Sequence, residues 1–313
     1  MRCGVVLVDG CFGSAVASLV DVLRTADAFR DQIDPAIPPI EITTISTGTT
    51  ATTSAGWAIP IDDGLDAIAG LDTVIVPALG ALTAEQVVTA LQTVQVKETI
   101  EAIKASEASL VGGACTGTFP LAEAGLLDGR EATTSWWLGA EFRKRYRSVT
   151  LHMDRMVVAD GPVITAGAAF AHVDLSLALV ASLSPELATL VAQLLVVDER
   201  PDQGSYIALE VVSRADPLVR EFERHVRAHL SDDITIEGIA DELGTSVRTL
   251  ERRLADTVGI SPMSFVQRVR VERALHLRST TDLSLDRIAT EVGYRNTSTL
   301  RALLRRHRGT SRI

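Results

Sequence analysis

The stretch Ile234-Thr-Ile-Glu-Gly-Ile-Ala-Asp-Glu-Leu-Gly-Thr-Ser-Val-Arg-Thr-Leu-Glu-Arg-Arg-Leu254 determines how the rest of the chain is interpreted. Its first half places apolar residues at helical spacing up to Gly244, where the pattern breaks. Ser246 is a favourable N-cap for a second helix. The stretch therefore predicts two short helices joined by a turn, with Arg248 and Arg252 together on the outer side of the second helix.

The same pattern occurs again further along the chain. Apolar residues and a turn glycine recur at an offset of 49 residues, at Leu285, Ile288, Ala289, Val292 and Gly293. Leu300 and Leu304 repeat Leu250 and Leu254 at an offset of 50, so the second turn contains one more residue. A pair of amphipathic helices is also a common packing unit, so one copy alone fits either DNA binding or plain helical packing. The repeat favours DNA binding.

Residues 263 to about 279, between the two copies, predict one longer helix. About 18 residues at 1.5 Å each span roughly 27 Å, which is comparable to one turn of duplex DNA. Two recognition helices can then enter successive major grooves. The inward residues are expected to be Phe265, Val269 and Ala274 or Leu275, and the solvent-facing ones Arg268, Arg270 and Arg273.

The segment from about residue 222 to residue 309 resembles the DNA-binding domain of the AraC/XylS family. The resemblance rests on a leading helix at residues 222–230, the pattern Ser246-x-Arg248-x-Leu250-x-Arg252, the connector Gly259-Ile-Ser-Pro262 and the second unit from Leu285. It implies double-stranded promoter DNA as a partner, and RNA polymerase is a further candidate partner.

The N-terminal part of each second helix is expected to face the base edges. The expected DNA-contacting residues are Arg248, Thr249, Glu251, Arg252 and Arg253 in the first unit, and Asn296, Thr297, Ser298, Arg301 and Arg305 in the second. Arg pairs with guanine and Glu accepts from cytosine, although Glu251 fits an intrahelical ion pair at least as well. Arg253 is expected at a phosphate. Ala302 stands where the family usually has a basic residue, and the Pro-x-x-Tyr-Arg ending common in the family is absent, so we expect the second unit to grip DNA more weakly.

Charge is divided unevenly along the chain, whose formal net charge is −10. Residues 216–313 carry 17 Arg against 14 Asp and Glu, a net charge of +3, whereas residues 1–215 carry 13 Lys and Arg against 26 Asp and Glu, a net charge of −13. An acidic region contributes little attraction to phosphates. DNA contact is therefore expected from the tail alone.

The first two thirds of the chain predict an α/β domain. Apolar runs of strand length at residues 3–9 and 73–77 alternate with helical patterns such as residues 15–28. Solid Val and Ile runs separated by helices indicate a parallel sheet covered by helices on both faces. Further strands are expected at residues 40–46 and 109–113, a hairpin at 156–159 and 163–165, and helices at 84–105, 168–183 and 185–196. We expect a domain at residues 1–196, a linker at 197–216, and an all-α DNA-binding domain at 217–313.

Cys115 directly follows a predicted buried strand and precedes a helix, as in a nucleophile elbow. A structural interpretation is that Gly112, Gly113 and Gly117 permit a tight turn in which Cys115 packs as a small apolar residue. Residues 1 to about 196 resemble the PfpI, class I glutamine amidotransferase-like fold, a flavodoxin-like sheet, especially in Cys115-Thr-Gly-Thr-Phe-Pro-Leu-Ala-Glu-Ala-Gly-Leu-Leu-Asp-Gly-Arg130 and the following Ala132-Thr-Thr-Ser-Trp136. Fused to an AraC-type tail, this domain resembles the GlxA-like class of regulators.

The chain departs from the catalytic pattern of that fold. Enzymes of the fold serve the elbow cysteine with a histidine and an acidic residue, but Thr116 and Ser135 stand where relatives carry His, and Ala15 stands where the acid is expected. His152 and His172 are the only histidines in this domain, and His172 is expected to be a satisfied core or pocket residue rather than a base. Lacking a base costs acyl transfer roughly a factor of 100 or more in rate. We expect a non-catalytic domain that binds a ligand and dimerises.

The crevice at the carboxyl ends of the parallel strands is the expected ligand site. Its candidate lining residues are Asp9, Cys115, Thr116, Ser135 and Trp136. Each also fits a structural role, and Trp136 with Trp137 fits a dimer contact equally well. The resemblance suggests a small nitrogen-containing effector, such as an amino acid, a betaine or an amide. The competing hypotheses are a cysteine-dependent hydrolase or amidase and a thiol redox sensor, both acting through Cys115.

Other features of the sequence limit the location and the chemistry. No apolar run approaches the ~20 residues that span a bilayer, and the N-terminus is too quickly acidic for a secretory signal. The three cysteines lack metal-ligand or disulfide-framework spacing. We expect a cytoplasmic, homodimeric, ligand-responsive transcriptional regulator without enzymatic activity, cofactor or metal.

Overall fold

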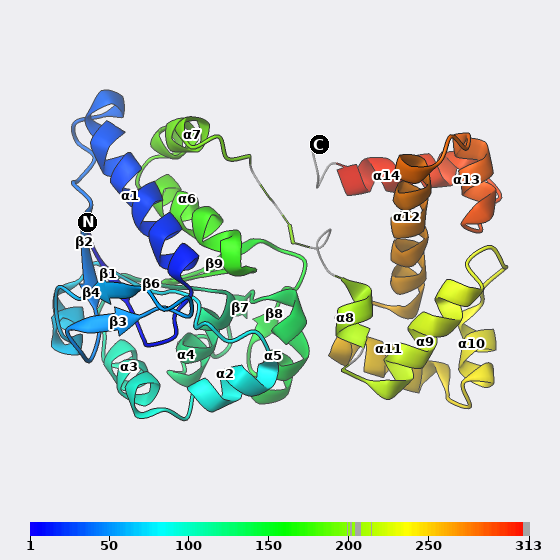
Figure 1. Cartoon of the computed structure of the whole chain (residues 1–313), viewed down its shortest axis with the longest axis horizontal. Coiled ribbons are helices and arrows are strands. Elements are labelled where there is room, and N and C mark those ends of the chain that lie inside the picture. Colours follow the sequence, from blue (N-terminus) through cyan, green and yellow to red (C-terminus); the bar gives the residue numbers. More distant parts are fainter. Residues whose placement is uncertain (199, 201, 204–207, 214, 309–313) are drawn as a thin grey trace. The chain divides into compact units, whose positions relative to one another are not determined.

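The computed structural model describes residues 1–198, 200, 202–203, 208–213 and 215–308, without the side chains of 306–308. The chain divides into two compact units, Met1–Gly204 and Ser205–Ile313 (Figure 1). The segment expected as a linker, residues 197–216, is partly packed: Gln203 is buried, and so are three residues of helix α8 (Leu209–Ser213), Leu209, Val212 and Ser213. The boundaries expected for the two domains and the linker stay a prediction. Among the described residues, no helix has the length and hydropathy needed to span a bilayer.

A six-stranded sheet, in the order β2-β1-β5-β6-β10-β9, forms the centre of the first unit. Its strands are β1 (Arg2–Val6), β2 (Glu41–Ile45), β5 (Thr73–Val76), β6 (Leu110–Ala114), β9 (Val157–Asp160) and β10 (Val163–Ala166). All neighbouring strands are parallel except β9 and β10, which pair antiparallel. The expected parallel sheet and the expected hairpin are both confirmed. Order and direction are those of a flavodoxin-like sheet with one added edge strand.

Helices cover both faces of this sheet, as expected (Figure 1). One layer contains α1 (Gly13–Ile33), α6 (His172–Leu183) and α7 (Pro185–Leu194), and the other contains α2 (Ala84–Ala90), α3 (Val94–Lys104), α4 (Thr118–Glu123) and α5 (Gly139–Arg145). Alternate strand residues serve the two layers: Val5 and Leu7 pack with the first, and Val6 and Val8 with the second. The single helix expected at residues 84–105 is two helices, because Thr93 caps a new one through the backbone of Val96.

Several short elements escaped the sequence interpretation. They are the hairpin β3 (Thr50–Thr52) with β4 (Ala58–Pro60), the pair β7 (Glu131–Ala132) with β8 (Thr150–Leu151), and the 3₁₀ turns η1 (Leu65–Gly70), η2 (Cys115–Gly117), η3 (Trp136–Leu138) and η4 (Ala169–Ala171). Elements of two to six residues are too short for a periodic apolar pattern.

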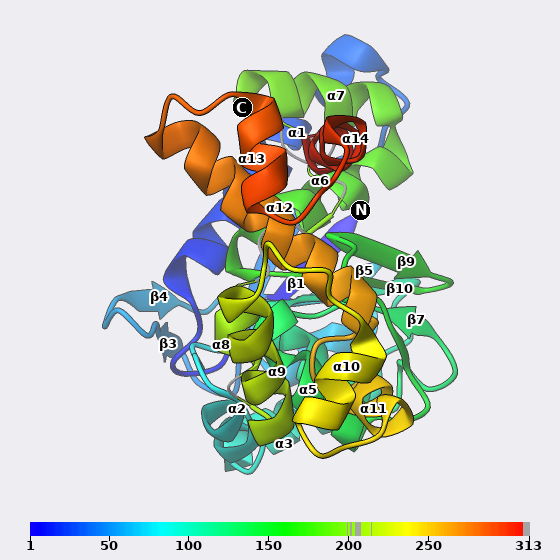
Figure 2. The same ribbon diagram turned by 90° about the vertical axis from the view of Figure 1, so that its right-hand side faces the viewer.

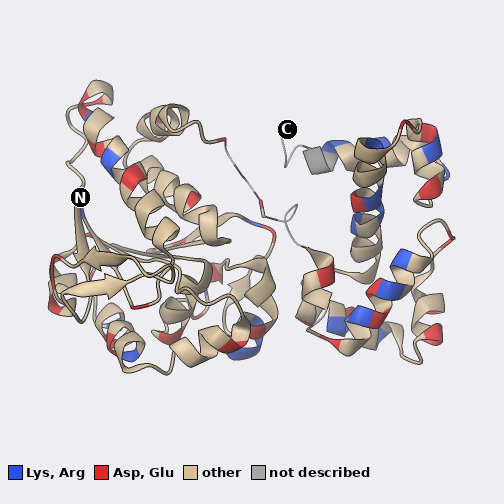
Figure 3. Cartoon of the chain, in the orientation of Figure 1, with Lys and Arg blue, Asp and Glu red and all other residues tan. Residues whose placement is uncertain are grey.

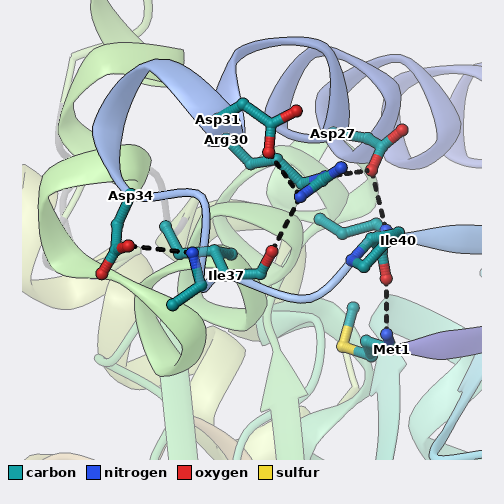
Figure 4. A network of polar contacts seen from close by, with 9 residues as sticks. Met1, Asp27, Arg30, Asp31, Asp34, Ile37 and Ile40 are labelled. Atoms are coloured by element: carbon teal, nitrogen blue, oxygen red, sulfur yellow. Dashed lines mark hydrogen bonds and ion pairs between the residues drawn. The ribbon is translucent and has the colours of Figure 1, made fainter.

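A polar network holds the connection between α1 and β2 (Figure 4). Arg30 pairs with Asp27 and Asp31 and donates to the carbonyl of Ile37 (2.9 Å). The backbone N–H of Ile40 donates to the Asp27 carboxylate (2.8 Å). These contacts fix the start of β2 and so the edge of the sheet.

The second unit contains only helices among its described residues. They are α8, α9 (Pro217–Ala228), α10 (Ile236–Glu242), α11 (Val247–Thr257), α12 (Pro262–Thr280), α13 (Leu285–Glu291) and α14 (Thr297–Arg308). Figure 2 shows α12 connecting the pair α10 and α11 with the pair α13 and α14. Gly244 and Gly293, in the two turns, both have positive φ, +63° and +78°. The predicted double helix-turn-helix with a long connecting helix is confirmed.

The connecting helix α12 forms more side-chain contacts within its unit than its sequence predicted. Phe265 and Val269 are buried as expected, and the ring of Phe265 lies edge-on to that of Phe222 (5.4 Å). Arg268 and Arg270, expected in solvent, are instead partly buried. Arg268 lies by Glu272, and Arg270 donates to the carbonyl of Asp232 (2.9 Å). Only Arg273 among the three expected arginines is exposed.

Candidate nucleic-acid interface and ligand site

The first recognition helix, α11, is positioned by its cap and its buried face. Ser246 Oγ accepts from the backbone N–H of Thr249 (3.1 Å), as the sequence predicts for an N-cap. Leu250 and Leu254 have no exposed surface and attach the helix to its own unit. The opposite face is therefore fixed in orientation and directed outward.

The expected reading residues share that outward face. Arg248, Glu251 and Arg252 are exposed, and with Thr249 and Ala255 they line one hollow of about 450 Å³. Arg248 and Arg252 form no ion pair with any described residue, and Glu251 lacks the intrahelical pair that the sequence also permitted. Unpaired guanidinium groups can form bidentate bonds to guanine without first breaking a salt bridge.

Arg253, expected at a phosphate, forms an ion pair within the second unit. Its guanidinium pairs with Asp216, whose side chain is only 10% exposed. Asp216 also caps α9 by accepting from the backbone N–H of Leu218 (2.9 Å). Arg253 therefore connects α11 to α9, because the helix turns it toward the interior rather than toward the face of Arg252.

The second recognition helix, α14, has fewer free side chains at its start. Asn296 Oδ1 accepts from the backbone N–H of Ser298 (2.8 Å) and so caps the helix, while the hydroxyl of Thr297 donates to Asp286. Ser298, Arg301 and Arg305 are exposed. Of the five residues expected to contact DNA here, Asn296 and Thr297 thus have structural roles that the sequence did not indicate.

Charged residues are spread over the helices of the second unit (Figure 3). Several arginines there are neutralised by neighbours: Arg227 by Glu223, Arg287 by Glu291 and Arg295 by Asp233. Arg301 and Arg305, like the two arginines of α11, form no ion pair within the described chain. Unpaired positive charge is therefore present on both helices that the sequence predicts as DNA readers, and also at Arg220 of α9 and at Arg273 and Arg278 of α12.

Cys115 occupies a strained turn between β6 and α4. Its φ is +57°, in the left-handed region that residues with a Cβ rarely adopt. A Cβ added to Gly117 would lie 2.2 Å from the carbonyl oxygen of Val76, so only glycine permits the close approach of this turn to β5. The local geometry is that of a nucleophile elbow, as the sequence predicts.

The thiol of this elbow is enclosed. Cys115 is 3% exposed and packs with Ala15 and Ala78. Ser135 Oγ lies 2.8 Å from Cys115 Sγ. Burial raises the pKa of the Cys115 thiol, and the hydrogen bonds from Ser135 and Thr116 offset this only in part. A helix N-terminus would lower the pKa of an exposed thiol, but here desolvation dominates.

His172 does not serve the thiol. Its Nε2 accepts from the backbone N–H of Ala78 (3.0 Å), and its Nδ1 donates to the carbonyl of Ala169 (2.6 Å). Both ring nitrogens are therefore engaged, and burial lowers the pKa of His172 to about 4. It is the satisfied core histidine that the sequence favours. The described residues contain no group of three or more His, Cys, Asp or Glu that would suit a metal ion.

A cavity of about 800 Å³ lies at the carboxyl ends of β1 and β5. Asp9 is in its wall, where its carboxylate accepts from the backbone N–H of Thr52 (2.8 Å) and its own N–H donates to Gln95 Oε1 (2.9 Å). Glu85 is a second carboxylate in the wall, and the wall contains no Lys or Arg. The location agrees with the crevice expected for an open α/β sheet.

The five candidate pocket residues do not line one surface. Asp9 borders the cavity, whereas Cys115, Thr116 and Ser135 are buried and are not part of its wall. Thr116 approaches it indirectly, by donating to the carbonyl of Leu79 (2.7 Å), which does line the cavity. Trp136 is half-buried and lies edge-on to Trp137 (5.2 Å). Gln95 and Glu85 were missed because a polar residue on an amphipathic helix gives no sign of facing a cavity.

Comparison with known proteins places both units in established classes. The profile of the DJ-1/PfpI family matches residues 7–182, and that of a helix-turn-helix domain matches residues 239–311. The chain belongs to the DJ-1/PfpI family, and its tail is a helix-turn-helix domain of the AraC type. Both resemblances expected from the sequence are confirmed.

Two relatives are transcriptional regulators by name. The chain is 31% identical over 196 residues to the HTH-type transcriptional regulator CdhR of Pseudomonas aeruginosa, and the aligned region covers 60% of this chain and 57% of CdhR. It is 25% identical over 248 residues to GbdR of the same species, also an HTH-type transcriptional regulator, and the aligned region covers 78% of this chain and 65% of GbdR. The matched region thus spans less than two thirds of either relative.

Two solved structures share the fold. An AraC family transcriptional regulator from Pseudomonas putida superposes with a TM-score of 0.52 at 21% identity, covering 62% of this chain and 98% of that one. A ThiJ/PfpI family protein from Pseudomonas syringae gives 0.53 at 18% identity, covering 72% and 86%. At these identities the likeness establishes the fold alone.

Proposed function

We propose that this protein is a ligand-responsive transcriptional regulator that binds double-stranded promoter DNA through its two helix-turn-helix motifs. The observation that carries the proposal is the outward face of α11, where Arg248 and Arg252 are exposed and without ion pairs beside Glu251. Arg at such positions reads guanine in the major groove. Two relatives named as HTH-type transcriptional regulators support the same function.

The first unit acts in this proposal as the sensor and dimerisation domain. Its effector occupies the cavity beside Asp9, where two carboxylates and no basic side chain favour a cationic or N–H-donating molecule. This chemistry supports the small nitrogen-containing effector expected from the sequence. Dimerisation through the first unit would place two tails on adjacent half-sites, and RNA polymerase is a candidate partner at the promoter. Its action on genomic DNA would be cytoplasmic.

A duplex selected from random sequences by the full-length protein tests the DNA-binding half of the proposal. Fluorescence anisotropy on that duplex should show affinity falling steeply with salt, because Arg contacts release counterions from the phosphates. Binding that is equally tight to unrelated duplexes would contradict sequence-specific recognition. A thermal-shift screen of metabolites on the full chain tests the sensor half, since a bound effector raises the melting temperature.

A cysteine-dependent hydrolase or a thiol redox sensor is less well supported. Both need an accessible, easily ionised thiol, but Cys115 is buried, its pKa is raised, and Ala15 and Ala78 are its neighbours in place of an acid or a base. Turnover of amides that disappears in Cys115→Ser would favour the enzyme. Normal DNA binding and effector response in Cys115→Ser would favour the regulator.

A further inference from the structure

One polar side chain from the segment between the two units is fully enclosed in the first unit. Gln203 has no exposed surface. Its amide nitrogen lies within hydrogen-bond distance of three acceptors, Thr133 Oγ1 (3.0 Å), the Thr134 carbonyl (2.8 Å) and the Arg155 carbonyl (3.2 Å). The structure therefore contains a niche for an N–H donor, and the chain itself fills it.

The other end of the same amide is poorly accommodated. Gln203 Oε1 is buried and has no hydrogen-bond partner among the described residues. A Cβ added to Gly167 would lie 2.6 Å from this oxygen, so the amide rests directly on the backbone there. A buried carbonyl oxygen without a donor weakens the attachment. The seated position of Gln203 is thus held by a smaller margin than a fully bonded side chain would give.

The niche and the Cys115 elbow are built from the same loop, residues 133–135. Thr134 gives its carbonyl to Gln203 and donates its hydroxyl to the carbonyl of Cys115 (2.8 Å). Ser135 Oγ lies between Cys115 Sγ (2.8 Å) and the carbonyl of Gly167 (3.2 Å). A displacement of this loop therefore changes the surroundings of Cys115 and Gln203 together.

The elbow in turn contacts one wall residue of the cavity proposed for the effector. Thr116, the neighbour of Cys115, donates to the carbonyl of Leu79, and Leu79 is part of the cavity wall. Contacts are thus continuous from the cavity to Gln203. Packed and hydrogen-bonded contacts of this kind are able to carry coupling, which only a measurement of coupling can establish.

A second contact fastens the same segment. Arg200 donates to the carbonyl of Phe170 (2.9 Å) and pairs with Asp174, whose side chain is 9% exposed. If Arg200 and Gln203 detach, each residue that is released adds up to about 3.3–3.6 Å to the connection between the units. A longer flexible connection lowers the effective concentration of one DNA-binding unit near its partner's half-site.

We propose that Gln203 is a latch, which we define as its side chain seated on loop 133–135 and Gly167. Through the Cys115 elbow, the effector cavity controls whether Arg200 and Gln203 stay attached to the first unit. The attached state restricts the reach of the DNA-binding unit, and the released state extends it. This inference rests on the proposed function, which it supplies with a route from ligand to DNA.

Hydrogen exchange of the full-length protein, followed by mass spectrometry, tests the latch. Gln203→Glu keeps the size of the side chain but removes the N–H donors, and Ser135→Ala removes the hydroxyl that contacts Cys115 Sγ and the Gly167 carbonyl without touching Gln203 itself. We expect the peptide covering residues 200–203 to exchange about fivefold faster or more in both variants, the factor that corresponds to one hydrogen bond. Gln92→Glu, at an exposed site, and Ser182→Ala, which loses a hydroxyl contact to Leu179 (2.6 Å), should leave that peptide unchanged.

Two results would overturn the latch. Unchanged exchange of residues 200–203 in Gln203→Glu means that the seated amide does not hold the segment. Faster exchange in Gln203→Glu but not in Ser135→Ala means that the elbow is not coupled to it. Wild-type exchange in β1 checks that each variant is folded, and Gln203→Met replaces Gln203→Glu if that check fails.

DNA affinity, measured on the same samples, separates this proposal from the proposed function. Specific DNA binding together with uncoupled exchange rejects the latch alone. Coupled exchange in a protein that binds no duplex specifically rejects the regulator function and leaves the latch as a property of the first unit.

Discussion

Replacing two adjacent arginines of α11 by alanine should affect different properties of the protein, DNA affinity for Arg252 and stability for Arg253. Arg252 is exposed and has no ion pair, so Arg252→Ala should leave the folded state intact and weaken specific DNA binding. A bidentate Arg–guanine contact is worth about 1–3 kcal/mol, or roughly 5- to 150-fold in affinity. Arg253 pairs with Asp216, and their side chains are 43% and 10% exposed, respectively. Arg253→Ala should therefore lower the free energy of unfolding by about 1 kcal/mol.

Thermal unfolding and anisotropy titrations on the selected duplex and its single-base variants distinguish the two effects. Arg253→Ala should lower the melting temperature by about 4–8 °C for a unit of about 100 residues, with base preference retained. Arg252→Ala should keep the melting temperature and relax preference at one base pair. If Arg252→Ala binds every duplex as wild type does, α11 is not the reading helix. If Arg253→Ala alters base preference, the orientation of the helix face is wrong.

Three further predictions concern a buried histidine, the two turn glycines and the elbow cysteine. Burial lowers the pKa of His172 from 6.5 to about 4, so the unfolded chain binds more protons than the folded one between these pH values. The free energy of unfolding should therefore fall by about 3 kcal/mol between pH 7 and pH 4 because of this residue. A folded His172→Gln variant should not show this part of the loss. Gly293→Ala should destabilise more than Gly244→Ala, since an added Cβ would lie 2.2 Å from the Leu230 carbonyl at Gly293 and meets nothing within 4 Å at Gly244; equal losses in chemical denaturation would contradict this packing. Iodoacetamide should label Cys115 at least about a hundredfold more slowly in the native protein than in urea, and comparable rates would show that the elbow opens readily.

The sequence was sufficient for the architecture because the fold depends on periodic apolar patterns and on glycine turns. Buried strands such as β5 and the repeated turns at Gly244 and Gly293 are local signals. The cap at Ser246 and the outward position of Arg248 follow from helical spacing alone. Each of these features needs only residues within one or two turns of helix.

The remaining features depend on contacts between distant residues. The pairing of Arg253 with Asp216 cannot be read from α11, because the partner lies on another helix. Burial of Gln203 was not foreseen either, since a Pro- and Gly-containing segment gives no pattern for a single inserted side chain. Sequence reasoning located the elbow correctly and offered both a packed and a pocket-lining Cys115, of which the structure shows the packed one.

Arg270 donates hydrogen bonds to the carbonyls of Leu230 and Asp232, a contact that we call the clamp. The clamp limits which changes in DNA target sequence are possible during evolution. One residue inserted into α12 would rotate the second motif by roughly 100° and break this clamp. Inserting seven residues would nearly restore the rotation but move the motif by about 10 Å, roughly three base pairs along the duplex. We therefore expect the protein not to bind DNA sites in which the distance between the segments contacted by α11 and α14 is changed. New target sites should arise by exchange of the arginines on these two helices rather than by a change in the length of α12.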